Sequence, residues 1–456
     1  MRHEIGLKKA AALRPGRFME RPTLKDWKAR LMHVLEEKAP TSTGEPAGKL
    51  QPMPAPKHAQ HAGLKSASGA PAYMRKPALP ALTGIRSLLA LTIMLFHFTP
   101  SGLTWAAHPR FTLYPIINIG YVFVSFFFVI SGFILYYNYA ERPGGVNAID
   151  FWVARASRLY PIYLLTMLVS IPMLAAEWHA RSHTQFVAGV ITTPLLIQGF
   201  FPRLATFWNT VSWTLSCEVA LYLLFPWLVK LKLPKGVPKL VAMGAVLWLL
   251  GMAPHAWYLA TNPDHLAHAP DRYSGGVYID FLKYTPLPYL CTFLCGITIG
   301  RIHQQARLGV RGRMMVGLAG FAIAWFCCYH LADDMPYILV HGGLLTPVFG
   351  MIILGLAGPS PLATIFSWRP LVAIGTSTYC LYLLHFNAYQ LIHDYHLPER
   401  LHVQWIDPWI SYAVIVLVAM AARKWVEHPF QIAIGNWWKR RREAQREDRE
   451  RLALAA

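Results

Sequence analysis

The chain has 456 residues, of which 54% are hydrophobic and only 14% are charged. Soluble domains carry about 25% charged residues, so this composition excludes an ordinary soluble globular protein. The remaining charge is basic, with a formal net charge of +20 at pH 7. Multi-span membrane proteins combine apolar spans with cytoplasmic loops rich in Lys and Arg. We therefore expect an all-α polytopic membrane protein.

The first 80 residues differ in composition from the rest of the chain. They contain fifteen Lys and Arg against six Asp and Glu, and the segment "APTSTGEPAGKLQPMPAPKHAQHAGLKSASGAP" is low in complexity. The sequence predicts a basic, largely disordered cytoplasmic tail over residues 1–80. Its segment "TLKDWKARLMHVLEE" is either an amphipathic helix on an anionic membrane surface or a loosely helical, solvated stretch.

Apolar segments long enough to span a bilayer begin after residue 80. About ten transmembrane helices are expected, roughly at 81–99, 115–138, 158–177, 210–230, 239–259, 284–302, 314–331, 337–357, 371–393 and 407–426. The shorter segment 185–201 is interpreted as re-entrant or interfacial. An even count places both termini and the basic loops in the cytoplasm. We therefore expect a multi-pass protein of the cell inner membrane, with a transmembrane domain at 81–430 and a basic cytoplasmic tail at 431–456.

Two ionisable residues lie in the first expected span, "TGIRSLLALTIMLFHF". Arg86 and His97 are eleven residues apart, which is about 16 Å along a helix and close to three turns. The spacing predicts that both lie on nearly one face, with Arg86 close to the cytoplasmic interface and His97 deeper. A snorkelling arginine and a packing histidine are the simpler interpretations.

Further ionisable residues lie in the segments "VSWTLSCEVALYLLFP" and "FWVARASRLYPIY". Glu218 falls at a depth similar to that of His97, so a pair in which the carboxylate supports a general base is expected; a purely structural ion pair is the alternative. Arg155 and Arg158 are at helical spacing on the cytoplasmic side, where two guanidinium groups suit phosphates. Their alternative role is that of ordinary cytoplasmic charge beside anionic lipid.

Six sequence segments together resemble the bacterial membrane acyltransferase family 3, whose members O-acylate cell-surface glycans. "RSLLALTIMLFH" is similar to the family's Arg-x10-His, "SFFFVISGFILYY" to its FFxxSGF element, and "ARASRLYPIY" to its RxxR segment. "SWTLSCEVALYLLFP", "GTSTYCLYLLHF" and "WVEHPF" resemble its later elements in the same order. One departure is Thr378, where the family has Ser. Some members carry a hydrolase-like domain after the membrane part, which we expect to be absent here.

The resemblance implies roles for His97 and Arg86, and the chemistry of the other residues extends the site. His97 is expected to be the general base that deprotonates an acceptor hydroxyl, with Arg86 and Glu218 in the same catalytic site. Arg86, Arg155 and Arg158 are expected to bind acyl-CoA, with acetyl-CoA as the donor. Ser131, Tyr379, Tyr382 and His385 are polar groups that could contact the substrate. The implied acceptor is a glycan or a lipid-linked glycan.

Other functions are compatible with the composition alone. Intramembrane His, Glu and Arg also occur in proton-coupled transporters, but those proteins often show two similar halves, and "FFVISGF" and "SWTLSCE" are not repeated later in the sequence. A non-catalytic scaffold has no need of a buried histidine and carboxylate. No metal-ligand spacing is visible, and beyond the membrane lipids and the two substrates we expect no nucleic-acid partner.

Overall fold

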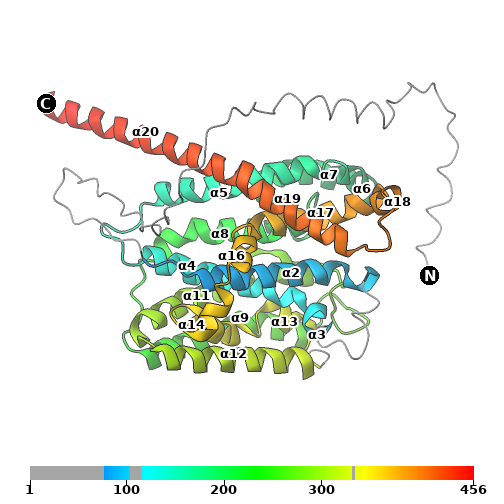
Figure 1. The fold of residues 1–456 in the computed structure, drawn as a ribbon, viewed down its shortest axis with the longest axis horizontal. Coiled ribbons are helices and arrows are strands. Elements are labelled where there is room, and N and C mark those ends of the chain that lie inside the picture. The colour runs from blue at the N-terminus through cyan, green and yellow to red at the C-terminus, as the bar shows by residue number, and fades with distance from the viewer. Residues whose placement is uncertain (1–75, 103–113, 331–333, 456) are drawn as a thin grey trace, which may run out of the picture. The chain divides into compact units, whose positions relative to one another are not determined.

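The computed structural model describes residues 76–102, 114–330 and 334–455. The tail predicted over residues 1–80 therefore lies almost wholly outside the described residues. Within the described ranges every regular element is a helix, as Figure 1 shows, which confirms the expected all-α class. The helices are α2 (Pro80–Gly102), α3 (Tyr114–Asn118), α4 (Phe123–Tyr139), α5 (Ala148–Val169), α6 (Met173–Ala180), α7 (His183–Thr192), α8 (Trp213–Leu228), α9 (Val237–Thr261), α10 (Val277–Tyr284), α11 (Pro286–Ala306), α12 (Val310–His330), α13 (Tyr337–Gly342), α14 (Thr346–Leu356), α15 (Pro361–Phe366), α16 (Arg369–Thr376), α17 (Thr378–Asp394), α18 (Leu397–Arg400), α19 (Trp409–Ala422) and α20 (His428–Ala455).

Short 3-10 turns and one π-helical segment join some of these helices. They are η1 (Gly120–Val122), η2 (Gln198–Phe200), η3 (Pro202–Leu204), η4 (Thr210–Ser212) and the π-helix η5 (Arg423–Glu427). The segment 185–201, expected to be re-entrant or interfacial, consists of most of the ten-residue helix α7 and the turn that follows it. A helix of that length is about 15 Å long, which is too short to cross the hydrocarbon.

Six described helical segments are long and apolar enough to cross a membrane. They are 80–98, 120–139, 210–228, 237–261, 310–330 and 409–455, and each overlaps one of the expected spans. The pair α5 and α6 would add a seventh if it is counted as one span, although it bends by 74°. The bend falls at Pro172, which lacks the N–H that a continuous helix requires. Multi-pass character is therefore supported, while the count of ten and the cytoplasmic side of the termini remain predictions.

The other expected spans differ from single apolar helices. Residues 337–357 divide into α13 and α14 at Gly343, whose φ of +107° lies in the left-handed region. Residues 371–393 divide into α16 and α17 at Ser377. Residues 284–302 lie mostly in α11, which has sufficient length but is not among the six apolar candidates. The expected C-terminal tail at 431–456 is the greater part of α20.

Close packing of α4 against α11 fixes the position of the SGF segment. A Cβ atom on Gly132 would lie 2.2 Å from the carbonyl oxygen of Phe293, and one on Gly296 would lie 2.2 Å from that of Val129. Any larger residue would force the two backbones apart. The neighbour of Gly132, Ser131, is thereby held at a fixed place on α4.

A side chain from α5 locks that helix to α8. Pro226 lies inside α8 and cannot donate the i to i−4 hydrogen bond that the carbonyl of Tyr222 would otherwise accept. The indole Nε1 of Trp152 on α5 donates to that carbonyl instead, at 3.2 Å. This bond joins the helix that carries Arg155 and Arg158 to the helix that carries Glu218.

Candidate active site

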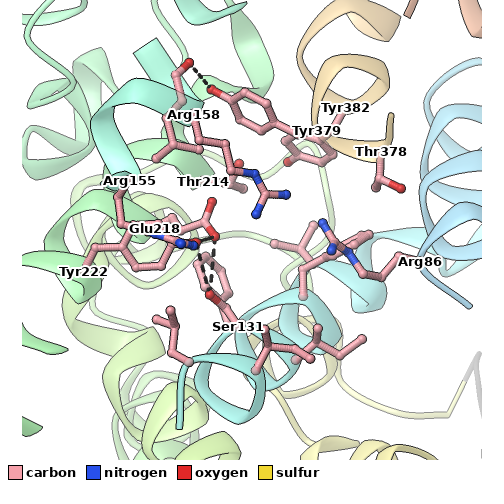
Figure 2. Close-up of a pocket in the computed structure, with 17 residues that line it drawn as sticks. Arg86, Ser131, Arg155, Arg158, Thr214, Glu218, Tyr222, Thr378, Tyr379 and Tyr382 are labelled. Carbon is pink, nitrogen blue, oxygen red and sulfur yellow. Dashed lines mark hydrogen bonds between the residues drawn. The ribbon is translucent and has the colours of Figure 1, made fainter. Parts of the chain in front are cut away.

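Helices α2, α4, α5, α8 and α17 surround a cavity that we name the arginine cavity. Figure 2 shows its polar side chains converging from these five helices. Seven of the nine predicted site residues line it; His97 and His385 do not. The polar lining residues are Arg86, Ser131, Arg155, Arg158, Thr214, Glu218, Tyr222, Thr378, Tyr379 and Tyr382.

Three guanidinium groups share this cavity, while Glu218 is the one carboxylate in its lining. The guanidinium carbon of Arg155 lies 5.6 Å from the ring centroid of Phe151. Neither Arg86 nor Arg155 makes an ion pair with any residue that the structure describes. The Nε atoms of both are buried without a hydrogen-bond partner in the described chain. The lining therefore carries an excess of positive charge, which is the requirement for holding a polyanion.

Arg158 is oriented by a carboxylate that sequence reasoning did not assign to the site. Glu427 is 1% exposed, and its Oε1 lies 3.7 Å from Nε of Arg158 and 3.2 Å from Nη1 of Arg423. The thiol of Cys380 donates to the other oxygen of Glu427 at 3.1 Å. Glu427 closes the π-helical segment η5, and π-helical turns are frequent at functional sites. The quoted "WVEHPF" segment contains this residue but gave no indication of its partner.

Glu218 does not form the ion pair with His97 that was expected; that prediction is wrong. Its Oε1 accepts a short hydrogen bond from the hydroxyl of Tyr222 one helical turn away, and another from Oγ of Ser131 at 3.3 Å. The similar depth expected from the sequence does not determine the direction in which either side chain points. Glu218 faces the arginine cavity, whereas His97 lines a different one.

His97 on α2 lies beside His385 on α17, with 5.3 Å between ring centroids. Nδ1 of His385 is 2.7 Å from the carbonyl oxygen of Tyr382, so that nitrogen donates a proton. In the neutral ring Nε2 then has a free lone pair, and it is buried without a partner in the described chain. The structure therefore places these two predicted site residues, from helices far apart in the sequence, side by side.

His97 lines a second cavity, which we name the aromatic chamber. The arginine cavity and the aromatic chamber share Tyr382 and Val124. Of the four expected substrate-contacting residues, Tyr382 is thus the one that faces both.

Two of the other expected substrate-contacting residues already have partners within the protein. The hydroxyl of Ser131 donates to Glu218, and the hydroxyl of Tyr379 donates to the carbonyl of Leu159 at 2.7 Å. No group of three or more His, Cys, Asp or Glu suited to a metal ion occurs among the described residues.

Comparison with known proteins identifies the family. The sequence model described as "Acyltransferase domain" matches residues 79–422. MdmB, an acyltransferase of Streptomyces mycarofaciens, is 25% identical over 323 residues, which are 69% of this chain and 80% of MdmB. A protein of Staphylococcus aureus strain COL, provisionally named an O-acetyltransferase, is 23% identical over 400 residues. The peptidoglycan O-acetyltransferase OatA of Listeria monocytogenes is 23% identical over 336 residues.

The match to the staphylococcal protein covers 82% of this chain but only 61% of that protein. The match to OatA covers 69% of this chain but only 50% of OatA. No solved structure matches the chain. The names of these relatives agree with the resemblance carried by the six sequence segments and favour an enzyme over a transporter or a scaffold. Because the family match extends over most of its length, the chain belongs to the acyltransferase-domain family, as the resemblance to membrane acyltransferase family 3 implied, and is an acyltransferase.

Proposed function

We propose that the chain is an integral O-acyltransferase of the cell inner membrane that transfers acetyl from acetyl-CoA to a glycan hydroxyl. The observation that carries the proposal is the arrangement of the two cavities. The arginine cavity holds three guanidinium groups, and it shares Tyr382 with the chamber that His97 lines. A polyanionic donor and a base near the acceptor are the two components that such a transfer requires.

The donor is proposed to bind in the arginine cavity. Coenzyme A carries a diphosphate and a 3′-phosphate, and guanidinium groups bind phosphate oxygens in a bidentate, charge-assisted manner. Arg155 and Arg158 lie at i and i+3 on α5 and thus present neighbouring forks. Arg86 enters the same cavity from α2. Phosphates on these residues would direct the thioester towards Tyr382 and the aromatic chamber.

The proposed reaction is direct acyl transfer. His97 removes the proton from an acceptor hydroxyl while that oxygen attacks the thioester carbonyl carbon. The tetrahedral intermediate collapses as the C–S bond breaks, and the CoA thiolate leaves and takes up a proton. The Tyr382 hydroxyl is the proposed donor to the oxyanion, since Tyr382 lines both cavities. His385 is proposed to hold the His97 ring in position.

Glu218 is not proposed as the partner of His97 but has another role. Its bonds to Tyr222 and Ser131 hold one negative charge among three positive ones. A fixed carboxylate there separates the guanidinium groups and orients them, because it attracts each without filling the cavity. We therefore assign Glu218 to the organisation of the donor site.

The acceptor is proposed to be a cell-surface glycan or a lipid-linked oligosaccharide. OatA is named for acetylation of peptidoglycan, which is a glycan polymer outside the cytoplasm. The six apolar helical segments support a multi-pass protein in contact with membrane lipids. A membrane-embedded site of this kind would connect a cytoplasmic donor with an acceptor beyond the membrane.

Mass spectrometry of surface polysaccharide tests this proposal. A strain lacking the protein should lose ester-linked acetyl groups, and the wild-type chain should restore them. His97→Ala should not restore them, whereas His330→Ala, which removes an exposed histidine outside both cavities, should. Unchanged acetylation in the deletion strain would overturn the proposal.

A further inference from the structure

The aromatic chamber has a lining chemistry that the donor does not explain. Aromatic side chains form most of its wall, and their rings support one another: Tyr121 and Tyr337 have centroids 4.8 Å apart, and Trp213 and Tyr284 have centroids 5.3 Å apart. Mutually packed rings of this kind form a rigid wall with apolar faces. A flat ligand with apolar faces of its own fits such a wall.

Several residues that carry hydroxyl groups line the same chamber. Within the described chain, the hydroxyls of Tyr121, Tyr284 and Tyr337 make no hydrogen bond to another residue. Thr206 and Thr210 add two further hydroxyls to the lining. Ring faces combined with several available hydroxyls suit a molecule that has apolar C–H faces and many hydroxyls at its edge. A sugar ring has both properties.

Arg272 is the one permanently charged residue among those that line the chamber. Its guanidinium carbon lies 5.0 Å from the ring centroid of Phe96, the neighbour of His97, and 4.7 Å from that of Tyr273. No carboxylate that the structure describes lies within ion-pair distance of it. A guanidinium group without a counter-charge, stacked on rings at the wall of a cavity, favours a carboxylate or phosphate as its partner.

The backbone around Arg272 is fixed by a buried lysine and an aspartate. Nζ of Lys283, which is 2% exposed, donates to the carbonyl oxygens of Arg272 at 3.2 Å and Ser274 at 2.9 Å. Oδ1 of Asp271 accepts hydrogen bonds from the backbone N–H groups of Tyr273 at 2.9 Å and Ser274 at 2.7 Å. The guanidinium group is therefore presented from an ordered loop, as pre-organised recognition requires.

We infer that the aromatic chamber binds the acceptor and that the acceptor is a glycan with an anionic group, which Arg272 binds while a hydroxyl of the sugar reaches His97. The anionic group is the carboxylate of a uronic acid or a phosphate ester. The inference rests on the proposed function for the chemical step. The recognition itself depends only on the chamber and can be measured without turnover.

Binding of matched sugar probes to the purified full chain in nanodiscs tests the inference. The probes are p-nitrophenyl β-glucuronide, p-nitrophenyl β-glucoside 6-phosphate and the neutral p-nitrophenyl β-glucoside, measured by equilibrium dialysis. At least one charged probe should bind about tenfold or more tightly than the neutral probe, as expected for a charge-assisted hydrogen bond. The tighter of the two charged probes identifies the source of the anion.

Arg272→Gln should reduce the preference for the charged probe to within about twofold, with neutral-probe binding unchanged. Arg400→Gln removes the same charge from an exposed position outside the chamber and should preserve the preference. Equal binding of charged and neutral probes by the wild-type chain would overturn the inference, and so would a preference that survives Arg272→Gln. Failure of acetyl transfer from acetyl-CoA, with the binding preference intact, would instead count against the proposed function.

Discussion

Arg155 and Arg158 present two guanidinium groups to the arginine cavity from successive turns of α5. Lysine would keep the charge but lose the planar fork that binds two phosphate oxygens at once. We expect Arg155→Lys and Arg158→Lys each to raise the apparent KM for acetyl-CoA about tenfold, with insertion unchanged. The measurement is the donor dependence of transfer in membranes that carry each variant.

Arg142→Lys is the matched control for these two variants. The guanidinium carbon of Arg142 lies 4.0 Å from the ring centroid of Tyr139, and Arg142 does not line the arginine cavity. The apparent KM of the Arg142→Lys variant for acetyl-CoA should therefore equal that of the wild type. An unchanged KM and an unchanged rate for both cavity variants would leave Arg155 and Arg158 as orientation signals for the membrane.

Glu218 accepts a hydrogen bond from Tyr222, so the two residues should act as one unit. We expect Glu218→Gln and Tyr222→Phe each to lower kcat/KM, and the double variant to lose little more than the worse single variant. The coupling free energy should be about 1 kcal/mol or more. Rates of the four proteins in one cycle provide the test, and losses that add in full would show that the two residues act separately.

Sequence spacing predicted part of this site because helices repeat every 3.6 residues. It placed Arg155 beside Arg158 and Glu218 on a helix face. The family resemblance added further residues, and seven of the nine residues predicted in these two ways line one cavity. It could not predict the partner of Glu218, since pairing between helices depends on how each helix is rotated. Arg272 was also beyond prediction: "DRYSG" is a loop segment, and only the folded chain brings it to His97.

Trp152 joins α5 to α8 by donating to the backbone carbonyl of Tyr222, which Pro226 leaves without a helical donor. Trp152→Phe keeps the ring but removes the donor, which should cost about 1–3 kcal/mol for an unsatisfied buried carbonyl. It should also raise the apparent KM for the donor, because α5 carries Arg155 and Arg158. Thermal unfolding in detergent and donor kinetics measure the two effects.

Pro226→Ala supplies a sharper version of the same experiment. Alanine restores the backbone N–H that can donate to Tyr222, so the double variant Trp152→Phe/Pro226→Ala should recover most of the stability. If Pro226→Ala adds a further loss instead of a recovery, the indole of Trp152 acts through packing rather than through its hydrogen bond.

Helix boundaries were predicted where apolar length alone decides them, as in the first span at 80–98. They were not predicted where a single residue interrupts an apolar run. Hydropathy treats 337–357 as continuous, whereas the positive φ of Gly343 divides it. The bend between α5 and α6 has the same kind of origin in Pro172. A hydropathy average cannot detect such interruptions, because they change backbone geometry and not polarity.

For the whole molecule, the basic ends of the chain predict its orientation. Lys and Arg dominate both the first 80 residues and the segment after 431, so both termini should lie in the cytoplasm. Reporter fusions at residues 40 and 450 test this: a cytoplasmic reporter should be active at both sites, and a periplasmic one at neither. Termini on opposite sides of the membrane would exclude an even number of spans.

We expect His97 to be the base for acyl transfer from acetyl-CoA. Native membranes carrying the wild-type chain should move label from radioactive acetyl-CoA to glycan and release CoA in equal amount. In His97→Ala and His97→Gln, transfer should fall about 100-fold or more, while the apparent KM for acetyl-CoA stays near that of the wild type because the donor cavity is intact. Wild-type rates in both variants would show that His97 is not the base.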